Sequence, residues 1–297
     1  MLCWKPLIKT DIDRTAKPLQ NVLSTGNIDL PYETEVSRRQ IDENDKQRKR
    51  NNDKMIPKKI HYCWFGDNPM PELAKKCIES WKKYCPDYEL KLWNEESFDL
   101  NSNPYAREAY EAKKFAFVTD YVRLWALYQY GGIYMDTDVE VLKPLDRFLI
   151  HPAFSGFESA EAVPTGIMAS EKNGKWAERE LEYYKDRHFL KADGTPDLTT
   201  NVAIITNNLV KDGFLLNNTY QEHKGIIVMY PQEYFCPKSY RDFKLHHLTE
   251  NTHTIHHFNG SWLTPYQKMR KSLYIFCDNH AKWLWKIFSA TKKVLKS

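Results

Sequence analysis

A helical pattern, a pair of glycines and a short apolar strand follow one another without interruption between residues 115 and 138. Apolar side chains recur at helical spacing over 115–130, and Gly131-Gly132 supply the backbone freedom that commonly ends a helix. The apolar run 133–135 then leads directly into Asp136-Thr137-Asp138. Because open α/β sheets bind ligands beyond the carboxyl ends of their strands, this order predicts an acidic site at a sheet edge.

The preceding segment has the order strand, helix, strand. An alternating run over 56–65 predicts a buried strand, helical spacing over 71–84 predicts a helix, and 88–94 predicts a second strand. This βαβ order favours an α/β fold with a mainly parallel central sheet. Farther along, a helix is expected over 175–186, and apolar runs occur at 201–210 and 225–231.

Charge and periodicity divide the 297 residues into three parts. Residues 1–54 are dense in charge and poor in periodic apolar positions, so we expect a flexible extension, unless translation begins at Met55. Residues 55–262 form the predicted folded domain and carry a net charge of −5. Residues 263–297 hold eight basic residues and a single acid, and are expected to form a basic amphipathic helix.

Composition excludes several classes of protein. No apolar run approaches the ~20 residues of a membrane span, and the first residues lack a secretory signal, so the expected location is cytoplasmic. The six cysteines include no CxxC pair, which argues against structural zinc and a disulfide scaffold. An acidic central part argues against a nucleic-acid binder, and the sequence contains no phosphate-binding or dinucleotide-binding glycine motif.

Asp136 and Asp138 have the spacing of a metal-binding pair. On an extended chain, side chains two residues apart point the same way, so both carboxylates can hold one hard divalent cation. Such a cation acts as a Lewis acid on a departing diphosphate. The triplet alone is also typical of a solvated turn. The residues on either side of it are needed to distinguish a metal site from such a turn.

Those flanks resemble a known family. The block FVTDYVRLWALYQYGGIYMDTDVEVL, together with IPKKIHYCWFGDNPMP before it and TIHHFNGSW after it, resembles glycosyltransferase family 32 over residues 55–262. That family includes capsular and lipopolysaccharide sugar transferases and yeast-type α-mannosyltransferases, and it is related to the glucosyltransferase domains of clostridial toxins. The resemblance implies a GT-A type nucleotide-sugar-binding fold and a retaining hexosyltransferase.

The resemblance also implies roles for single residues. Trp64 takes the place of an aromatic that stacks on the donor base. Asp120 and Arg123 take the places of residues that contact the sugar and the diphosphate, and their spacing puts them on one helix face. Asp138 is expected to bind the metal directly, and Asp136 to bind the ribose or sugar and the metal, directly or through water.

In the family a ligand from the C-terminal loop completes the metal site. Here the candidates are His257, Asn259 and Ser261, with Trp262 expected to close over the donor. Because adjacent histidines point to opposite sides of a strand, we expect only one of His256 and His257 to bind metal, with His257 preferred. A histidine ligand favours Mn2+ over Mg2+.

The expected reaction moves a hexose from a nucleotide-diphosphate sugar, with a UDP-sugar favoured, to a saccharide or lipid-linked oligosaccharide acceptor in surface or capsular polysaccharide synthesis. GDP-mannose is the alternative donor. The tail 263–297 places lysines opposite Trp, Phe and Leu, which suits a helix lying on an anionic membrane. We therefore expect a peripheral protein at the inner membrane face, although a tail packed on the domain fits the same pattern.

Two other functions remain open. A haloacid-dehalogenase-like phosphatase would use Asp136 as nucleophile and Asp138 as acid, but that family places its motif near the start of the domain. A sugar-binding or scaffold protein without catalysis is the other alternative. The segments 165–169 and 199–201 occupy positions where relatives contact substrates, but their residues do not indicate roles.

Overall fold

The computed structural model describes most of the predicted domain. The described residues are 56–164, 166–223, 225–240, 242–246 and 248–260, with Tyr266, Met269, Ser272, Leu273 and Phe276. The predicted extension 1–54 lies outside the described residues, as do Ser261, Trp262 and the rest of the tail 263–297. The boundaries of those two segments therefore stay predictions.

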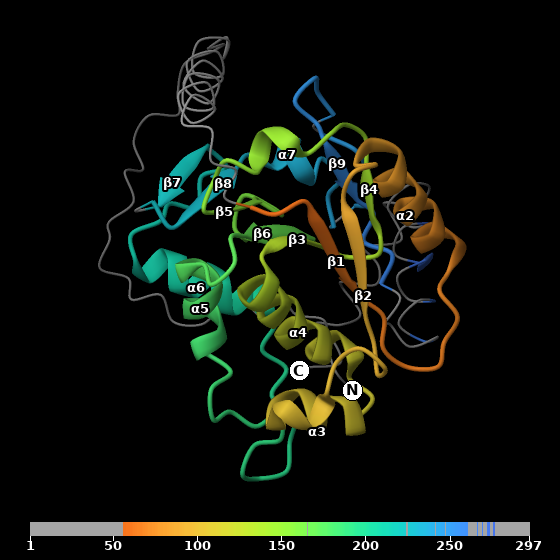
Figure 1. Ribbon diagram of the computed structural model, residues 1–297, viewed down its shortest axis with the longest axis vertical. Coiled ribbons are helices and arrows are strands. Elements are labelled where there is room, and N and C mark those ends of the chain that lie inside the picture. The colour runs from red at the N-terminus through yellow and green to blue at the C-terminus, as the bar shows by residue number, and fades with distance from the viewer. Residues whose placement is uncertain are drawn as a thin grey trace, which may run out of the picture.

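A seven-stranded sheet forms the centre of the described domain (Figure 1). Its strand order is β2-β1-β3-β6-β5-β8-β7, and within it β6 and β7 run against the other five strands. The strands are β1 (Lys59–Cys63), β2 (Glu89–Trp93), β3 (Gly132–Met135), β5 (Ala153–Gly156), β6 (Ile167–Ser170), β7 (Gln221–His223) and β8 (Ile227–Tyr230). The predicted α/β fold with a mainly parallel central sheet is confirmed. A second, two-stranded sheet pairs β4 (Val139–Val141) with β9 (Thr254–His256) in antiparallel fashion.

Helices cover both faces of the central sheet (Figure 1). The α-helices are α2 (Glu72–Tyr84), α3 (Pro104–Glu111), α4 (Phe115–Tyr130), α5 (Lys175–Glu182), α6 (Asn201–Lys211) and α7 (Gln232–Phe235). The predicted helix over 115–130 is confirmed at both ends, the one over 175–186 ends at Glu182, and the apolar run 201–210 is helical. The helix α3 and the strands β4 to β6 were not predicted, because short buried segments lack a readable period.

Within the described part of the chain, no helix combines the length and the apolarity that crossing a bilayer requires.

The strand β3 divides its side chains between two cores. Tyr134 packs with the helices α3 to α6 on one face of the sheet, whereas Ile133 and Met135 pack with α2 and α7 on the other. This alternation follows from the period of two along a strand. The strand is therefore buried on both faces, and its position is fixed where it runs into Asp136.

Gly131 makes the tight entry into β3 possible. It caps α4 with φ of 65°, and its N–H donates to the carbonyl of Leu127. A Cβ at this position would lie 2.6 Å from the backbone nitrogen of Lys172. Only glycine fits both the backbone angle and the space, so the predicted helix stop is confirmed.

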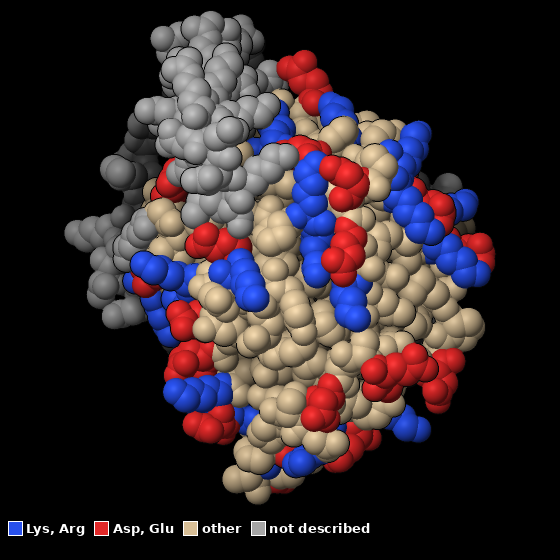
Figure 2. Space-filling view, in the orientation of Figure 1, with Lys and Arg blue, Asp and Glu red and all other residues tan. Residues whose placement is uncertain are grey.

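Charges of both signs are interspersed over the face shown in Figure 2. Charges of opposite sign also pair elsewhere in the described domain, as Lys58 does with Asp146 at 2.6 Å and Lys82 with Glu79 at 2.7 Å. The described part of this face therefore presents mixed charge rather than an extended basic stripe.

Candidate functional site

Asp136 and Asp138 lie at the carboxyl end of β3, as predicted. The N–H of Asp136 donates to the carbonyl of Gly166 at 2.8 Å, and the N–H of Val139 donates back to the carbonyl of Asp136 at 2.9 Å. This tight turn brings the two carboxylates together. Ligand atoms of Asp136, Asp138 and His256 all lie within 4.8 Å of one another.

His256 reaches the acidic pair because of the register between β4 and β9. Val139 pairs with His256, so the imidazole is placed beside the residue that follows Asp138. The Nε2 atom of His256 lies 3.4 Å from Oδ1 of Asp138 and 3.8 Å from Oδ2 of Asp136. The histidine is 8% exposed, and the side chains of Asp136 and Asp138 are 26% and 16% exposed.

This geometry places His256, and not the preferred His257, beside the acidic pair, and which of the two binds metal stays a prediction. The Nε2 atom of His257 lies 2.9 Å from Oε2 of Glu140, on the side of the strand away from the acidic pair. The expectation that only one of the two adjacent histidines turns toward the carboxylates holds, but the one that does is His256. The choice could not be made from sequence, because it depends on the register of β9 against β4.

The segment after β9 also contacts the acidic pair. The backbone N–H of Asn259 donates to Oδ2 of Asp138 at 2.7 Å. Asn259 was a candidate through its side chain, and the structure shows a contact through its amide. Ser261 and Trp262, the other two candidates, lie outside the described residues.

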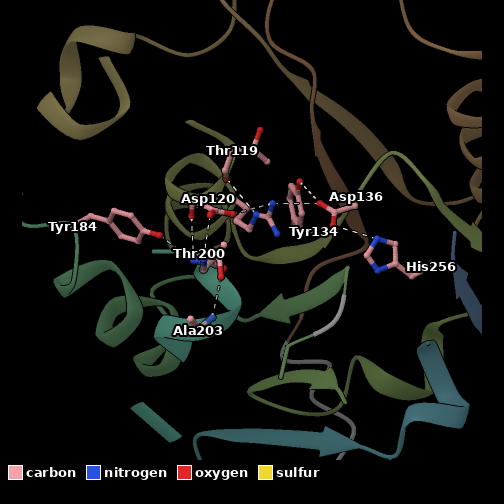
Figure 3. A network of polar contacts seen from close by, with 10 residues as sticks. Thr119, Asp120, Tyr134, Asp136, Tyr184, Thr200, Ala203 and His256 are labelled. Carbon is pink, nitrogen blue, oxygen red and sulfur yellow. Dashed lines mark hydrogen bonds and ion pairs between the residues drawn. The ribbon is translucent and has the colours of Figure 1, made fainter. Parts of the chain in front are cut away.

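Arg123 connects the helix α4 to the acidic pair. Figure 3 shows Asp120 and Asp136 within one network of polar contacts. Its Nη2 atom lies 3.2 Å from Oδ1 of Asp120 and 3.4 Å from Oδ1 of Asp136. The Nε–H donates to the carbonyl of Thr119 at 3.3 Å, which holds the guanidinium plane. The predicted pairing of Asp120 and Arg123 on one helix face is present, and both side chains are nearly buried at 12% and 11% exposure.

Three further residues support this network, and the sequence analysis assigned them no role. The hydroxyl of Tyr134 donates to Oδ1 of Asp136 at 2.9 Å, and the guanidinium of Arg123 lies 4.6 Å from the centre of the Tyr134 ring. The backbone N–H of Asn201 donates to Oδ2 of Asp120 at 3.1 Å, and its side-chain amide donates to the hydroxyl of Tyr184. Tyr134 could have been found from its period-two spacing to Asp136.

Asn201 is the first residue of α6, and the preceding Thr200 caps that helix by accepting the N–H of Ala203 (Figure 3). The carboxylate of Asp120 therefore lies at a helix N-terminus, where unpaired amides and the helix dipole favour negative charge. The sequence of residues 199–201 does not by itself indicate this contact. The described contacts of this segment position Asp120.

The surroundings of Asp120 and Asp138 shift the pKa values of these two acids in opposite directions. Burial raises the pKa of Asp120 to about 6, although Arg123 and the amide of Asn201 oppose the rise. For Asp138 burial also disfavours the charge, but His256 and the amide of Asn259 outweigh it and lower the pKa to about 2. Asp138 is therefore a permanent carboxylate near neutral pH, as a metal ligand has to be.

Trp64 directly follows β1, at the edge of the sheet where Asp136 follows β3. The two strands are parallel neighbours with His61 opposite Tyr134. The backbone N–H of Trp64 donates to the carbonyl of Trp93 at 2.9 Å, and its indole N–H donates to the carbonyl of Asn68 at 2.8 Å. The ring is half-buried, and its role in stacking on a base stays a prediction.

The donor set fits a divalent cation. Two carboxylates and one imidazole converge from β3 and β9, which is a combination that Mn2+ accepts and that Mg2+ accepts through its oxygen ligands. Asp136, Asp138 and His256 are the residues that would hold it. The identity of the metal stays a prediction.

Part of the chain matches a known family. Residues 71–155 match the family model described as a glycosyltransferase sugar-binding region containing a DXD motif. The predicted residues Asp120, Arg123, Asp136 and Asp138 all fall inside the matched segment. The resemblance to sugar transferases with an acidic DXD motif is confirmed over this part of the chain.

Similar proteins come from yeasts. Inositol phosphoceramide mannosyltransferase 3 of Schizosaccharomyces pombe is 35% identical over 125 residues, which cover 39% of this chain and 34% of that protein. Mannosyl phosphorylinositol ceramide synthase of Saccharomyces cerevisiae is 31% identical over 120 residues, covering 39% of this chain and 31% of that protein. The chain thus matches about a third of the length of these curated relatives. A solved structure, the PaToxG glycosyltransferase, aligns with a TM-score of 0.39 and 20% identity over 60% of this chain and 77% of that one.

Proposed function

We propose that this chain, whose residues 71–155 carry a glycosyltransferase DXD sugar-binding region, is a divalent-metal-dependent glycosyltransferase. It would move a hexose from a nucleotide-diphosphate sugar to a hydroxyl of a saccharide or lipid-linked acceptor, with retention of configuration. The observation that carries the proposal is the convergence of Asp136, Asp138 and His256 beside the buried guanidinium of Arg123.

Each residue of the site has a task in such a reaction. A divalent cation held by Asp136, Asp138 and His256 would supply a Lewis acid for the departing diphosphate. Arg123 is held between Asp120 and Asp136. Its remaining N–H groups can donate to phosphate oxygens while the side chain keeps this conformation. Asp120 can accept hydrogen bonds from donor sugar hydroxyls. Because these groups are fixed before substrate binds, they need little reorganisation during the reaction.

The base and sugar of the donor remain the open part of the proposal. A uridine donor is favoured by the toxin-like combination of Trp64 with Asp120 and Arg123. GDP-mannose is the second candidate, and it is favoured by relatives that are named mannosyltransferases and are 31–35% identical over the region of the acidic motif. Both donors present a diphosphate to the same residues.

A donor-release assay tests the proposal. UDP-glucose, UDP-galactose, UDP-N-acetylglucosamine and GDP-mannose would each be incubated with the full chain and Mn2+, with and without EDTA. We expect release of nucleotide diphosphate from one donor, loss of that release with EDTA, and at least a hundredfold loss in Asp138→Asn. The control Glu182→Gln changes an exposed carboxylate on α5 and should behave as wild type. Turnover of no donor, or full turnover in EDTA, would refute the proposal.

The sequence of the basic tail, residues 263–297, suggests where in the cell the enzyme would act. We propose that residues 263–297 bind an anionic membrane, which would bring the domain to acceptors of surface or capsular polysaccharide at the inner membrane face. Cosedimentation with vesicles containing phosphatidylglycerol tests this. Replacing Lys282, Lys286 and Lys293 by Glu should abolish binding, and unchanged binding would contradict the proposal.

A further inference from the structure

A polar cavity of about 210 Å³ is lined by residues of the segments that follow β5 and β8. Its lining includes Glu158, Ser159, Glu161, Gln232, Ser239 and Tyr240. These residues follow the carboxyl ends of β5 and β8, two strands that run parallel to β3. The cavity therefore opens from the sheet edge that carries Asp136 and Asp138.

Glu158 links the cavity to the metal-binding residues on one side. It lies two residues beyond β5, and Asp136 lies one residue beyond β3, with the start of β6 between them. The hydroxyl of Ser155 on β5 donates to the carbonyl of Ile167 on β6 at 2.6 Å, which holds the two strand ends together. Burial raises the pKa of Glu158 to about 7, and the charges of His256 and Asp136 both act on its carboxylate.

An aromatic row links the cavity to the same residues on the other side. The ring of Tyr240, which lines the cavity, lies 6.1 Å from the ring of Phe258. The ring of Phe258 lies 4.1 Å from that of His256. The lining of the cavity is thus connected to the candidate metal site through two separate parts of the chain, Glu158 on one side and Tyr240 with Phe258 on the other.

The lining indicates the chemistry of that ligand. Carboxylate, amide and hydroxyl groups predominate, and no lysine or arginine contributes to the described lining. Gln232 is fixed by donating its side-chain N–H to the carbonyl of Glu158 at 2.9 Å. The lining also includes the imidazole of His246, whose Nε2 atom lies 2.7 Å from Oδ2 of Asp242. The hydroxyl and amide groups of this wall can hydrogen bond to a neutral ring, whereas the carboxylates of Glu158 and Glu161 disfavour a phosphate or carboxylate by charge repulsion. The volume is below the ~300–1,000 Å³ of pockets for drug-sized ligands, which suits a single ring.

We propose that this cavity is the acceptor subsite, that it takes a neutral polyhydroxylated ring such as a hexose or a cyclitol, and that Glu158 hydrogen bonds to the attacking hydroxyl. This inference rests on the proposed transferase function. In the transfer, the hydroxyl oxygen forms the new bond to the anomeric carbon, the bond from that carbon to the diphosphate oxygen breaks, and the hydroxyl proton passes to the departing diphosphate. Glu158 orients the hydroxyl for this step.

Saturation-transfer NMR on the full chain tests the inference without requiring turnover. The probes are the methyl α-glycosides of glucose, galactose and mannose, together with myo-inositol, and methyl glucuronide as the anionic counterpart. Each would be measured with Mn2+ and UDP or GDP present. We expect transfer of saturation from the protein to at least one neutral ring and no transfer to the glucuronide. Saturation of no neutral ring, or equal saturation of the glucuronide, would overturn the inference.

Two variants locate the binding. Ser159→Phe should fill the cavity, and Glu158→Gln should remove the negative acceptor while keeping the shape. In both we expect at least a fivefold loss of saturation, larger than any change in donor hydrolysis, and none in Glu182→Gln. Thermal unfolding identifies a variant that fails to fold, and Glu158→Gln then decides alone. Unchanged saturation in folded Glu158→Gln would overturn the role of Glu158, whereas missing donor release in the wild type would refute the transferase proposal instead.

Discussion

The Nη2 atom of Arg123 lies 3.4 Å from Oδ1 of Asp136, and this contact joins the helix α4 to the acidic motif that follows it. The same nitrogen lies 3.2 Å from Asp120, and the guanidinium lies over the ring of Tyr134. A single cation therefore contacts two carboxylates at the buried end of the site. The arrangement serves stability and donor binding together, and the two contributions can be separated by substitution.

Replacing Arg123 by Met should destabilise the fold, because Asp120 would be left as an uncompensated buried acid. Removing one partner of a buried ion pair costs about 3–5 kcal/mol. The control is Arg107→Met, which removes a pair with Glu111 in which both side chains are exposed, at 44% and 67%, and should cost below about 1 kcal/mol. Urea unfolding followed by tryptophan fluorescence measures both. Equal losses in the two variants would contradict the buried-pair account.

Arg123→Lys keeps the charge but loses the planar fork of donors. We expect this variant to fold with a smaller loss of stability than Arg123→Met, yet to lose at least tenfold in donor turnover, because the compact ammonium lacks the planar fork that can bind the two carboxylates while directing further N–H donors toward a phosphate oxygen. Donor release at saturating Mn2+ is the measurement. Wild-type turnover in Arg123→Lys would show that only the charge matters.

The two adjacent histidines should differ in their effect on metal binding. His256 contacts Asp138 and Asp136, so His256→Ala should weaken Mn2+ binding at least tenfold. His257 contacts Glu140, so His257→Ala should change the affinity less than threefold. Titration of Mn2+ followed by electron paramagnetic resonance gives both constants without donor or acceptor. A larger effect at His257 would restore the prediction made from sequence.

Local patterns were enough to predict the elements that frame the site. The helix α4, its glycine stop and the strand β3 form one continuous sequence, so periodicity and turn chemistry predicted both their order and the acidic edge beyond them. The βαβ unit of β1, α2 and β2 was readable for the same reason. In each case the period that identifies a helix or strand lies within a window of about 11–18 residues.

Contacts between distant segments were not readable. The choice between His256 and His257 depends on how β9 pairs with β4, more than a hundred residues away, and a shift of one residue would reverse it. Glu158 and Asn201 approach the site only because β5 ends there and α6 begins there. No local period marks either residue, so a carboxylate and an amide of this kind look like ordinary loop residues in the sequence.

The stability of the fold should fall as the pH is lowered, because the buried imidazole of His61 resists protonation. His61 accepts a hydrogen bond from the indole of Trp93 at Nδ1 and donates from Nε2 to the carbonyl of Gly131. Burial lowers the pKa of His61 to about 4 from its ordinary 6.5, and a proton on Nδ1 would face the N–H of Trp93. The unfolded chain therefore binds a proton between pH 6.5 and about 4 that the folded chain does not.

Because the unfolded state gains protons in that window, stability is full above pH 6.5 and declines as the pH falls toward 4. At pH 5 the loss from His61 is about 2 kcal/mol. Urea unfolding at pH 7.5 and pH 5 measures it, and His61→Gln, which can still donate and accept, should lose about 2 kcal/mol less over the same interval. An identical pH response in wild type and variant would exclude His61 as the source.

Gly166 should be sensitive to a single methyl group because it lies between the start of β6 and the ring of His256. A Cβ there would lie 3.0 Å from Cε1 and Nδ1 of His256 and 3.0 Å from Val139. We expect Gly166→Ala to push the imidazole away from the carboxylates and to weaken Mn2+ binding severalfold.

The matched control is Gly156→Ala, whose Cβ would meet Phe235 at 2.9 Å in the core. That variant should lose about 1–3 kcal/mol of stability by overpacking while its Mn2+ affinity stays within twofold of wild type. If both variants lost metal affinity in proportion to stability, the space beside Gly166 would have no specific role in placing His256.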